Sequence, residues 1–423
     1  MNVRDSESAA GVLCKMGYEQ IDDIAKADIV LFNTCCIREL AEQKAISAVG
    51  AMRKHKDKDA QKIIGVFGCM TQQEGVAQEI KRRFPYVDFI FGTNNIHLLP
   101  QLIQQAQSGQ SALVTGQGQP NEDFDLPAMH NAPPLAYVNI VFGCNNFCSY
   151  CIVPYVRGRE ESRPKQLIID EVKSLVDQGY QEVTLLGQNV NSYGKDIDDS
   201  FAGLLRALDQ TGIERIRFMT SHPKDLSQAM IDAMAECDSV CKGIHLPVQS
   251  GSDTILQAMN RKYDAANYLA LVESLRKAMP DIGITTDLIV GFPGETEQDY
   301  NDTLELVKTV GFDSAYMFAF SPRKGTKAAE MAKQIEDQTK QQRLKRLIAL
   351  QADITMDIHK SLVGQTHSVL VEGFSRKDEK HLTGRMERGR MVNFLGEKDL
   401  LGQTVLVKIT RANKNTLFGE RSM

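Results

Sequence analysis

Cys144-Asn145-Asn146-Phe147-Cys148-Ser149-Tyr150-Cys151 is the stretch that decides the fold of this chain, and it carries three thiols spaced by three and then two residues. It follows residues 137–142, whose apolar run predicts a strand. Soft thiolate ligands select iron–sulfur clusters or zinc, and a short loop can offer three of them to one face of a cubane cluster. No fourth Cys follows at a ferredoxin-like spacing, which leaves one iron open to a non-protein ligand. The stretch therefore predicts a 4Fe–4S cluster that performs chemistry.

Two simpler interpretations of the three thiols stay open. A structural zinc ion needs four ligands, usually from two CxxC pairs, and this loop contains neither a fourth Cys nor a His. The thiols could also be buried and unliganded, since free Cys often behaves as a small hydrophobic residue.

The spacing resembles that of the radical S-adenosylmethionine (SAM) enzymes, whose signature is CxxxCxxC with an aromatic residue before the last Cys, here Tyr150. The resemblance implies that the open iron binds the amino and carboxylate groups of SAM. It also implies that one electron from the cluster cleaves SAM to a 5′-deoxyadenosyl radical.

Composition sets the class of protein. The chain has 423 residues, of which 42% are hydrophobic, enough for two to four domains. Its nine Cys are odd in number and lack the spacings of a secreted disulfide framework, which indicates a reducing compartment. No apolar run approaches the roughly 20 residues of a membrane span, and the N-terminus lacks signal-peptide features. We therefore expect a soluble, cytoplasmic protein.

Charge is distributed unevenly along the chain. The net charge of −5 argues against nucleic-acid binding by the chain as a whole. Residues 364–423, however, contain eleven Lys and Arg against seven Asp and Glu, a local charge of +4. The pattern indicates a small basic module on an acidic body.

The first part of the chain predicts an α/β domain, because strand-like and helix-like segments alternate up to about residue 124. Thiols follow two of its predicted strands, in Asn33-Thr34-Cys35-Cys36 and Gly68-Cys69-Met70. Ligands gather beyond the carboxyl ends of strands in open α/β sheets, so these thiols mark a place for a second cofactor. The alternative is that they are small buried residues near a turn. Residues 120–134, rich in Pro, predict a linker.

Beyond the linker, six strand–helix units predict a partial TIM-like barrel, a (βα)6 arrangement whose active site lies on the loops after the strands. The predicted strands are 137–142, 182–186, 215–220, 243–247, 283–290 and 314–320, and a helix over 338–362 leads to the last domain. Short alternating runs punctuated by Gly from residue 366 onward predict a small antiparallel β-barrel. The predicted domains are 1–125, 126–363 with the linker helix, and 364–423.

Loops after the predicted barrel strands resemble the SAM-binding loops of the radical SAM enzymes. Their amide, hydroxyl and carboxylate groups offer hydrogen bonds to the ribose and amino acid parts of SAM, although turn chemistry alone explains any single loop. The resemblance implies SAM contacts for Gln188, Asn189, Gln249, Ser250 and Asp287.

The whole chain resembles the methylthiotransferases, which join an N-terminal domain with a second 4Fe–4S cluster, a radical SAM barrel and a C-terminal RNA-binding TRAM barrel. Four segments are similar to the branch that modifies N6-isopentenyladenosine beside the anticodon of tRNA. These are Asn33-Thr34-Cys35-Cys36-Ile37-Arg38-Glu39, Val153-Pro154-Tyr155-Val156-Arg157-Gly158, Gly187-Gln188-Asn189-Val190-Asn191 and Val392-Asn393-Phe394. The implied reaction uses two SAM molecules: one methylates a cluster-bound sulfur, and the other yields the radical that removes hydrogen from C2 of the adenine.

Carried over residue by residue, the resemblance implies that Cys144, Cys148 and Cys151 hold the SAM-cleaving cluster. Cys35 and Cys69 match the second and third ligands of the auxiliary cluster. The first ligand should lie in a Gly-Cys-Gln-Met-Asn stretch, and Met1-Asn2 falls inside that stretch. We therefore expect a reading frame that starts too far downstream, or else an auxiliary cluster with two matching thiols and Cys14 or Cys36 as a substitute. Cys36 is the poorer substitute if the chain is extended there, because neighbouring side chains then point to opposite faces.

Basic residues in the last domain predict contact with RNA, with Phe374 and Phe394 available to stack on bases. They are Arg376, Lys377, Lys380, Arg385, Arg388 and Arg390. An ordinary solvated face is the alternative from charge alone, and the TRAM resemblance favours RNA. The expected partners are a tRNA carrying N6-isopentenyladenosine and an electron donor such as flavodoxin or ferredoxin, with the chain as a monomer.

Four other residues are expected to be structural. Cys237 and Cys241 form a second CxxxC but match no family ligand, and His222 and His245 are expected to be satisfied core residues. Two other functions remain open: a methylthiotransferase that acts on an aspartate of a ribosomal protein, and a non-catalytic RNA-binding homologue.

Overall fold

The computed structural model describes residues 1–36, 39–116, 123–376 and 378–422. The chain forms two compact units. Unit 1 comprises 1–131, 141–145 and 152–163, and unit 2 comprises 132–140, 146–151 and 164–423. None of the described helices combines the length and the hydropathy that crossing a membrane requires.

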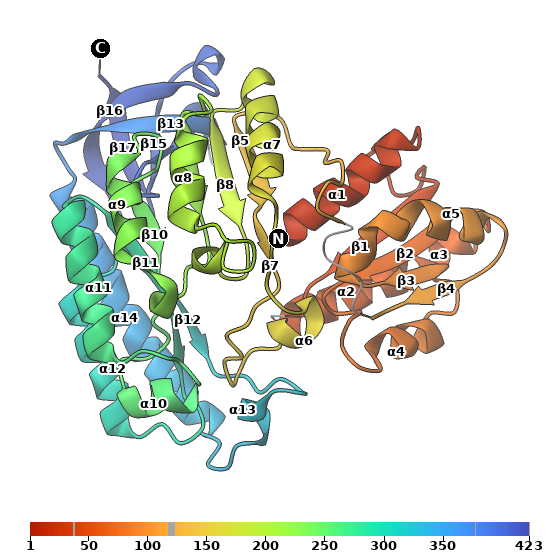
Figure 1. The fold of residues 1–423 in the computed structure, drawn as a ribbon, viewed down its shortest axis with the longest axis horizontal. Coiled ribbons are helices and arrows are strands. Elements are labelled where there is room, and N and C mark those ends of the chain that lie inside the picture. The colour runs from red at the N-terminus through yellow and green to blue at the C-terminus, as the bar shows by residue number, and fades with distance from the viewer. Residues whose placement is uncertain (37–38, 117–122, 377, 423) are drawn as a thin grey trace. The chain divides into compact units, whose positions relative to one another are not determined.

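Unit 1 is built on a parallel sheet of four strands in the order β1-β2-β3-β4 (Figure 1). Its elements are α1 (Asn2–Lys15), β1 (Ile29–Thr34), α2 (Glu39–Ala51), α3 (Arg53–Lys56), β2 (Ile63–Gly68), α4 (Val76–Arg83), β3 (Phe89–Phe91), η1 (Thr93–Leu98), α5 (Leu99–Gln107), β4 (Ala112–Val114), β6 (Val141–Phe142), α6 (Val153–Arg157) and β7 (Glu161–Ser162). β2 is buried along its whole length because apolar clusters cover both faces of the sheet. The predicted alternation of strands and helices in an α/β domain is therefore observed.

Unit 2 contains six parallel strands that form the predicted partial barrel. The strands are β5 (Leu135–Asn139), β8 (Glu182–Leu186), β9 (Arg215–Phe218), β10 (Gly243–His245), β11 (Gly283–Val290) and β12 (Ser314–Ala319). They pair as β5-β8-β9 and β10-β11-β12, and a bridge between Ile216 and Val240 joins the two sets. Along β11, alternate residues are buried or half-buried, so one row of side chains packs under the helices and the other faces the interior of the barrel.

Helices follow the barrel strands, and the longer ones cover their outer surface (Figure 1). They are α7 (Lys165–Asp177), α8 (Phe201–Asp209), α9 (Gln228–Glu236), α10 (Asp253–Ala258), α11 (Ala265–Ala278), α12 (Glu297–Val310), α13 (Lys327–Glu330) and α14 (Asp337–Ser361), with the short turns η3 (Val190–Ser192) and η4 (Pro223–Asp225). The starts of several helices are fixed by side-chain caps. Thr296 and Asp299 form a capping box at the start of α12.

The C-terminal part of unit 2 is a closed five-stranded barrel in the order β13-β14-β15-β17-β16. Its elements are β13 (Thr366–Ser375), β14 (Asp378–Met386), β15 (Met391–Leu395), η5 (Lys398–Leu400), β16 (Thr404–Ala412) and β17 (Leu417–Arg421). Alternate residues of these strands fill its core, as the period-two pattern predicted.

The C-terminal barrel is fastened to the amino ends of the six parallel strands. Arg217 of β9 donates to the carbonyl oxygens of Met386 and Glu387 at 2.8 and 2.7 Å. Asp313, directly before β12, pairs with Arg388 at 2.9 Å. Gly283 touches the backbone of Arg388, where a Cβ would clash. These contacts hold the turn between β14 and β15 against the end of the barrel opposite the candidate loops.

Candidate functional site

Cys144 and Asn145 belong to unit 1, where a tight turn after β6 positions them. Gly143 has φ +69°, and a Cβ there would clash with the carbonyl oxygen of Arg159. The Cys144 amide donates to the Gly158 carbonyl at 3.1 Å, and the Asn145 amide donates to Glu160 at 3.1 Å. Only glycine suits the conformation that places Cys144 at this turn.

The rest of the thiol loop, Asn146–Cys151, belongs to unit 2, where α10 and the residues after it hold it. The Ser149 amide donates to Met259 at 3.0 Å, and its hydroxyl donates to Ala258 at 2.9 Å. Asn260 donates to the Phe147 carbonyl at 2.9 Å. Cys148 and Cys151 remain half-buried, so both sulfurs are held in place without being sealed from ligands.

Tyr150, the aromatic residue before the last thiol, packs on an apolar cluster that contains Phe292 and Phe320. Burial raises its pKa well above 10, and the nearby Cys148 and Cys151 add to this effect. The phenol therefore stays neutral, and its role is to anchor the loop by packing.

Arg261 also reaches this loop, and sequence reasoning did not identify it. Its Nη1 lies 3.3 Å from the Cys148 sulfur. No spacing rule connects residues 148 and 261, so only the tertiary structure brings them together.

The loops that follow the barrel strands present unpartnered acceptors. The side-chain carbonyl oxygens of Gln188 and Asn189 are buried and have no hydrogen-bond partner in the described part of the chain. The Asn189 amide nitrogen is fixed by Asp225 at 2.7 Å, which turns the amide oxygen away from that carboxylate. A buried acceptor without a partner is costly unless a ligand donates to it. These two oxygens fit a donor such as the amino group of SAM.

Gln249 forms backbone hydrogen bonds to β11, whereas Ser250 contacts α12 through its hydroxyl group. Gln249 has φ +72°, and its amide and carbonyl bond Asp287 and Ile289 of β11, both at 2.9 Å. The Ser250 hydroxyl instead contacts the Thr303 hydroxyl of α12 at 3.2 Å. Gln249 thus joins two strands at their carboxyl ends, whereas the Ser250 side chain is engaged in holding α12.

His222 and His245 are both buried and have hydrogen-bond partners. The His222 ring caps η4 by accepting from the Lys224 amide at 3.3 Å. Burial, together with the charges of Arg261, Lys224 and Lys195, lowers its pKa to about 2. His245 contacts Thr285 at 3.0 Å, and its other ring nitrogen lies 3.4 Å from Asp287. The prediction that both are satisfied residues is confirmed.

The thiols of unit 1 gather at the carboxyl ends of β1 and β2. The Cys36 amide donates to the Cys69 sulfur at 3.2 Å, and that sulfur also contacts the Thr34 carbonyl at 3.4 Å. The Cys35 thiol lowers the pKa of Cys69, but the Cys36 thiol and burial outweigh it and raise the value to about 11. The chain bends after Thr34, so the alternation of an extended strand does not apply to Cys35 and Cys36, and a ligand role for Cys36 stays a prediction.

Cys14 is exposed in the last part of α1. In the described residues, no three His, Cys, Asp or Glu side chains are grouped as ligands of a single metal ion. This finding concerns sites for one metal ion such as zinc, and not sites for a larger cubane cluster. Cys35, Cys36 and Cys69 at the ends of β1 and β2 are donors of the type that iron–sulfur clusters use.

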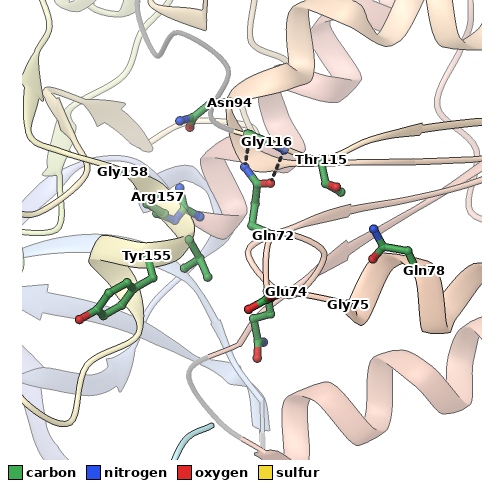
Figure 2. Close-up of a pocket in the computed structure, with 12 residues that line it drawn as sticks. Gln72, Glu74, Gly75, Gln78, Asn94, Thr115, Gly116, Tyr155, Arg157 and Gly158 are labelled. Carbon is green, nitrogen blue, oxygen red and sulfur yellow. Dashed lines mark hydrogen bonds between the residues drawn. The ribbon is translucent and has the colours of Figure 1, made fainter. Parts of the chain in front are cut away.

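A cavity of about 290 Å³ in unit 1 is lined by Tyr155, Arg157 and Gly158 on one side and by residues from Gln72 to Gln78 on the other (Figure 2). Gln72 forms a wall, since its side chain donates to Gly116 at 2.8 Å and accepts from it at 3.1 Å. The segment 153–158, which resembles the tRNA branch of the methylthiotransferases, therefore lines a polar cavity.

Three of the predicted RNA-contact residues lie beside carboxylates of the same chain. Arg388 pairs with Asp313 at 2.9 Å, Arg390 lies 3.6 Å from the same carboxylate, and Arg385 pairs with Glu372 at 2.7 Å. Arg376 and Lys380 are exposed, and Lys377 lies outside the described residues. The expectation that Phe394 stacks on bases was wrong, because this ring fills the core of the C-terminal barrel, whereas Phe374 is exposed. Cys237 and Cys241 are buried, as expected.

Three family models match successive parts of the chain. Residues 1–92 match the uncharacterized protein family UPF0004, residues 138–307 match the radical SAM superfamily, and residues 360–421 match the TRAM domain.

Two relatives match almost the whole chain. The tRNA-2-methylthio-N(6)-dimethylallyladenosine synthase of Thermoanaerobacter sp. (strain X514) is 50% identical over 99% of this chain and 90% of that protein. The enzyme of the same name from Clostridium botulinum (strain Loch Maree / Type A3) is 47% identical over 99% of this chain and 94% of that protein. Among solved structures, the radical SAM methyltransferase TsrM from Kitasatospora setae matches 86% of this chain and 75% of its own, with a TM-score of 0.59 and 13% identity. That likeness supports the fold alone.

Proposed function

The chain belongs to the family of tRNA-2-methylthio-N(6)-dimethylallyladenosine synthases, and from this premise we propose that it converts N6-isopentenyladenosine beside the anticodon of tRNA to its 2-methylthio derivative. The observation that carries the proposal is that Cys148 and Cys151 lie on a loop held by the residues after α10 in unit 2, and that Cys144 completes the CxxxCxxC spacing in the sequence. Hydrogen at C2 of adenine is neither acidic nor part of an electrophilic centre, so its replacement calls for radical chemistry that a cofactor supplies.

We assign the three thiols of the loop as ligands of a 4Fe–4S cluster, which membership of the radical SAM superfamily implies together with SAM. When bound, such a cluster supplies the electron that cleaves SAM to a radical. The amide oxygens of Gln188 and Asn189 would accept hydrogen bonds from the amino group of SAM, and Gln249 and Asp287 lie at the same end of the barrel. Backbone hydrogen bonds between Gln249 and β11 fix the orientation of the loop after β10 at this end of the barrel.

We further propose that Cys35 and Cys69 hold an auxiliary cluster, on the support of their position at one sheet edge beside Cys36. The polar cavity that residues 153–158 line is a candidate site for substrate groups in unit 1. We propose three functional modules: residues 1–125 with the auxiliary thiols, residues 126–363 with the thiol loop, and residues 364–423 with the tRNA contacts.

tRNA is the proposed macromolecular partner, through the C-terminal barrel. Exposed Arg376 and Lys380 are the supported phosphate contacts, whereas Arg388 and Arg390 already bind a carboxylate within the chain. We propose a monomer that acts in the cytoplasm, where tRNA is modified, with a one-electron donor such as flavodoxin or ferredoxin.

The test is nucleoside mass spectrometry of tRNA from cells that lack the endogenous enzyme. We expect this chain to restore the methylthio mark, Cys148→Ala to abolish it, and Cys241→Ala to retain it as a buried thiol without a ligand role. If the complemented cells accumulate unmodified N6-isopentenyladenosine while an aspartate of a ribosomal protein gains mass, the tRNA assignment fails.

A further inference from the structure

The guanidinium group of Arg261 is buried against one thiol of the cluster loop. Its Nη1 donates to the Cys148 sulfur at 3.3 Å, its Nη2 donates to the Pro247 carbonyl at 2.9 Å, and its Nε donates to the Tyr263 hydroxyl at 2.8 Å. The residue is 8% exposed. Each nitrogen therefore has a defined acceptor, and the one nearest the cluster site is a sulfur.

The surroundings of Arg261 determine its position. The Tyr263 hydroxyl donates to the Val248 carbonyl at 2.9 Å, so the acceptor of the Arg261 Nε is itself fixed. One residue earlier, Asn260 has φ +59° and donates to the Phe147 carbonyl at 2.9 Å. The segment after α10 thus holds the thiol loop in place by hydrogen bonds to the Phe147 carbonyl and to the Cys148 sulfur.

Arg261 is a buried cation without a carboxylate. In the described part of the chain no ion pair with Asp or Glu involves this residue, and the groups around it are Tyr263, Tyr150 and Cys148. A buried charge is costly unless it is paired, and the Cys148 sulfur, 3.3 Å from Nη1, is the group beside Arg261 that a bound metal would make negative. A cysteine ligand carries that charge, because the thiolate is the form that binds metal.

We propose that Arg261 is a positioning residue for the cluster, and that its charge and its N–H···S bond raise the reduction potential of the centre held by Cys148. Hydrogen bonds to cluster sulfurs and the net charge of the surroundings are known determinants of such potentials. Reduction adds one electron and one negative charge, breaks no bond and takes the electron from an external one-electron donor. Arg261 stabilises the more negative state.

The inference rests on the proposed role of Cys144, Cys148 and Cys151, and it is tested on the holoprotein. Cys35→Ser/Cys69→Ser serves as the background, so that one cluster is followed by electron paramagnetic resonance during titration with dithionite. Arg261→Gln removes the charge, Arg261→Lys keeps it with a different geometry, and Lys262→Gln removes a charge from the neighbouring exposed side chain. We expect Arg261→Gln to lower the equilibrium constant for reduction about tenfold, equivalent to about 59 mV for one electron. Arg261→Lys should give a smaller shift, and Lys262→Gln should match the unmodified background.

Equal midpoint potentials in Arg261→Gln and Lys262→Gln would overturn the inference. If Arg261→Gln fails to hold a cluster, the midpoint potential of Arg261→Lys decides the matter. A potential below that of Lys262→Gln supports the inference, and an equal potential refutes it. A background protein whose spectrum does not respond to SAM would instead contradict the proposed function, so the two failures are distinguishable.

Discussion

The ion pair between Asp313 and Arg388 should be the strongest single connection between the parallel barrel and the C-terminal barrel. Asp313 is 3% exposed and receives hydrogen bonds from Arg388 at 3.1 Å and from the Ile284 amide at 3.1 Å. Arg390 lies 3.6 Å from the same carboxylate. Asp313→Asn preserves the shape and the bond to Ile284 but turns an uncharged amide toward two cations.

The expected cost follows from burial. Removing one partner of a buried pair costs about 3–5 kcal/mol. Because Arg388 and Arg390 keep 17% and 13% side-chain exposure, water screens them, and we expect about 2–3 kcal/mol. Each 1.4 kcal/mol is a factor of ten, so local opening of the turn between β14 and β15 should become roughly 30- to 140-fold more frequent.

Hydrogen exchange of the backbone amides in residues 384–390 measures this opening directly. It is preferred to whole-chain unfolding because two compact units need not unfold together. Glu236→Gln is the matched control: it breaks the Arg206–Glu236 pair, which has the same 2.9 Å distance but is exposed, and it should leave exchange of the turn unchanged. Exchange in Asp313→Asn no faster than in Glu236→Gln would refute the reasoning that burial makes this pair important.

Three further predictions concern unit 2 and the free thiols. The ring of His222 stays neutral in the folded protein, with a pKa of about 2, but protonates near pH 6.5 when unfolded, so stability is lost as pH falls below 6.5, by about 1.4 kcal/mol per pH unit. His222→Asn keeps an acceptor for the cap and should flatten stability between pH 6.5 and pH 5 in acid denaturation; an unchanged slope would contradict this. Gly251→Ala places a Cβ against the backbone of α12 and should weaken SAM binding in equilibrium dialysis, whereas Gly373→Ala, with open space, should not; equal affinities would count against the packing argument. In the cluster-free protein, iodoacetamide should modify exposed Cys14 well before Cys241, whose pKa burial raises to about 12, and mass spectrometry of the labelled peptides would reveal the reverse order.

Local patterns predicted much of the fold. β8 and β11 begin and end where the sequence places them, because apolar residues alternate along them and turn residues flank them. The starts of α11 and α12 carry capping side chains, which are sequence features that mark where a helix begins. The thiol loop and the pair Cys35 and Cys69 were predicted as ligands because ligand spacing and strand ends are sequence features.

Contacts between distant segments could not be predicted in the same way. Arg261 reaches Cys148 across 113 positions of sequence, and no periodicity encodes that contact. Arg388 and Arg390 were predicted to contact RNA from their charge and the TRAM resemblance, because the sequence does not reveal that Asp313 lies opposite them. Phe394 was misjudged because an aromatic residue in a short strand can face either side, and the register that turns it inward depends on the closed barrel.

The attachment of the C-terminal barrel has a consequence for the size of what this protein can engage. The attachment lies at the amino ends of the parallel strands, and the loops with Gln188 and Gln249 lie at the carboxyl ends. β11 has eight residues, so at about 3.3 Å per residue the strand is about 26 Å long. Because barrel strands are tilted, the two ends are somewhat closer together than that length. A substrate that contacts both the C-terminal barrel and these loops, as the proposed function requires, would have to span a distance of this order. A folded nucleic-acid arm has such a length and a free nucleoside does not.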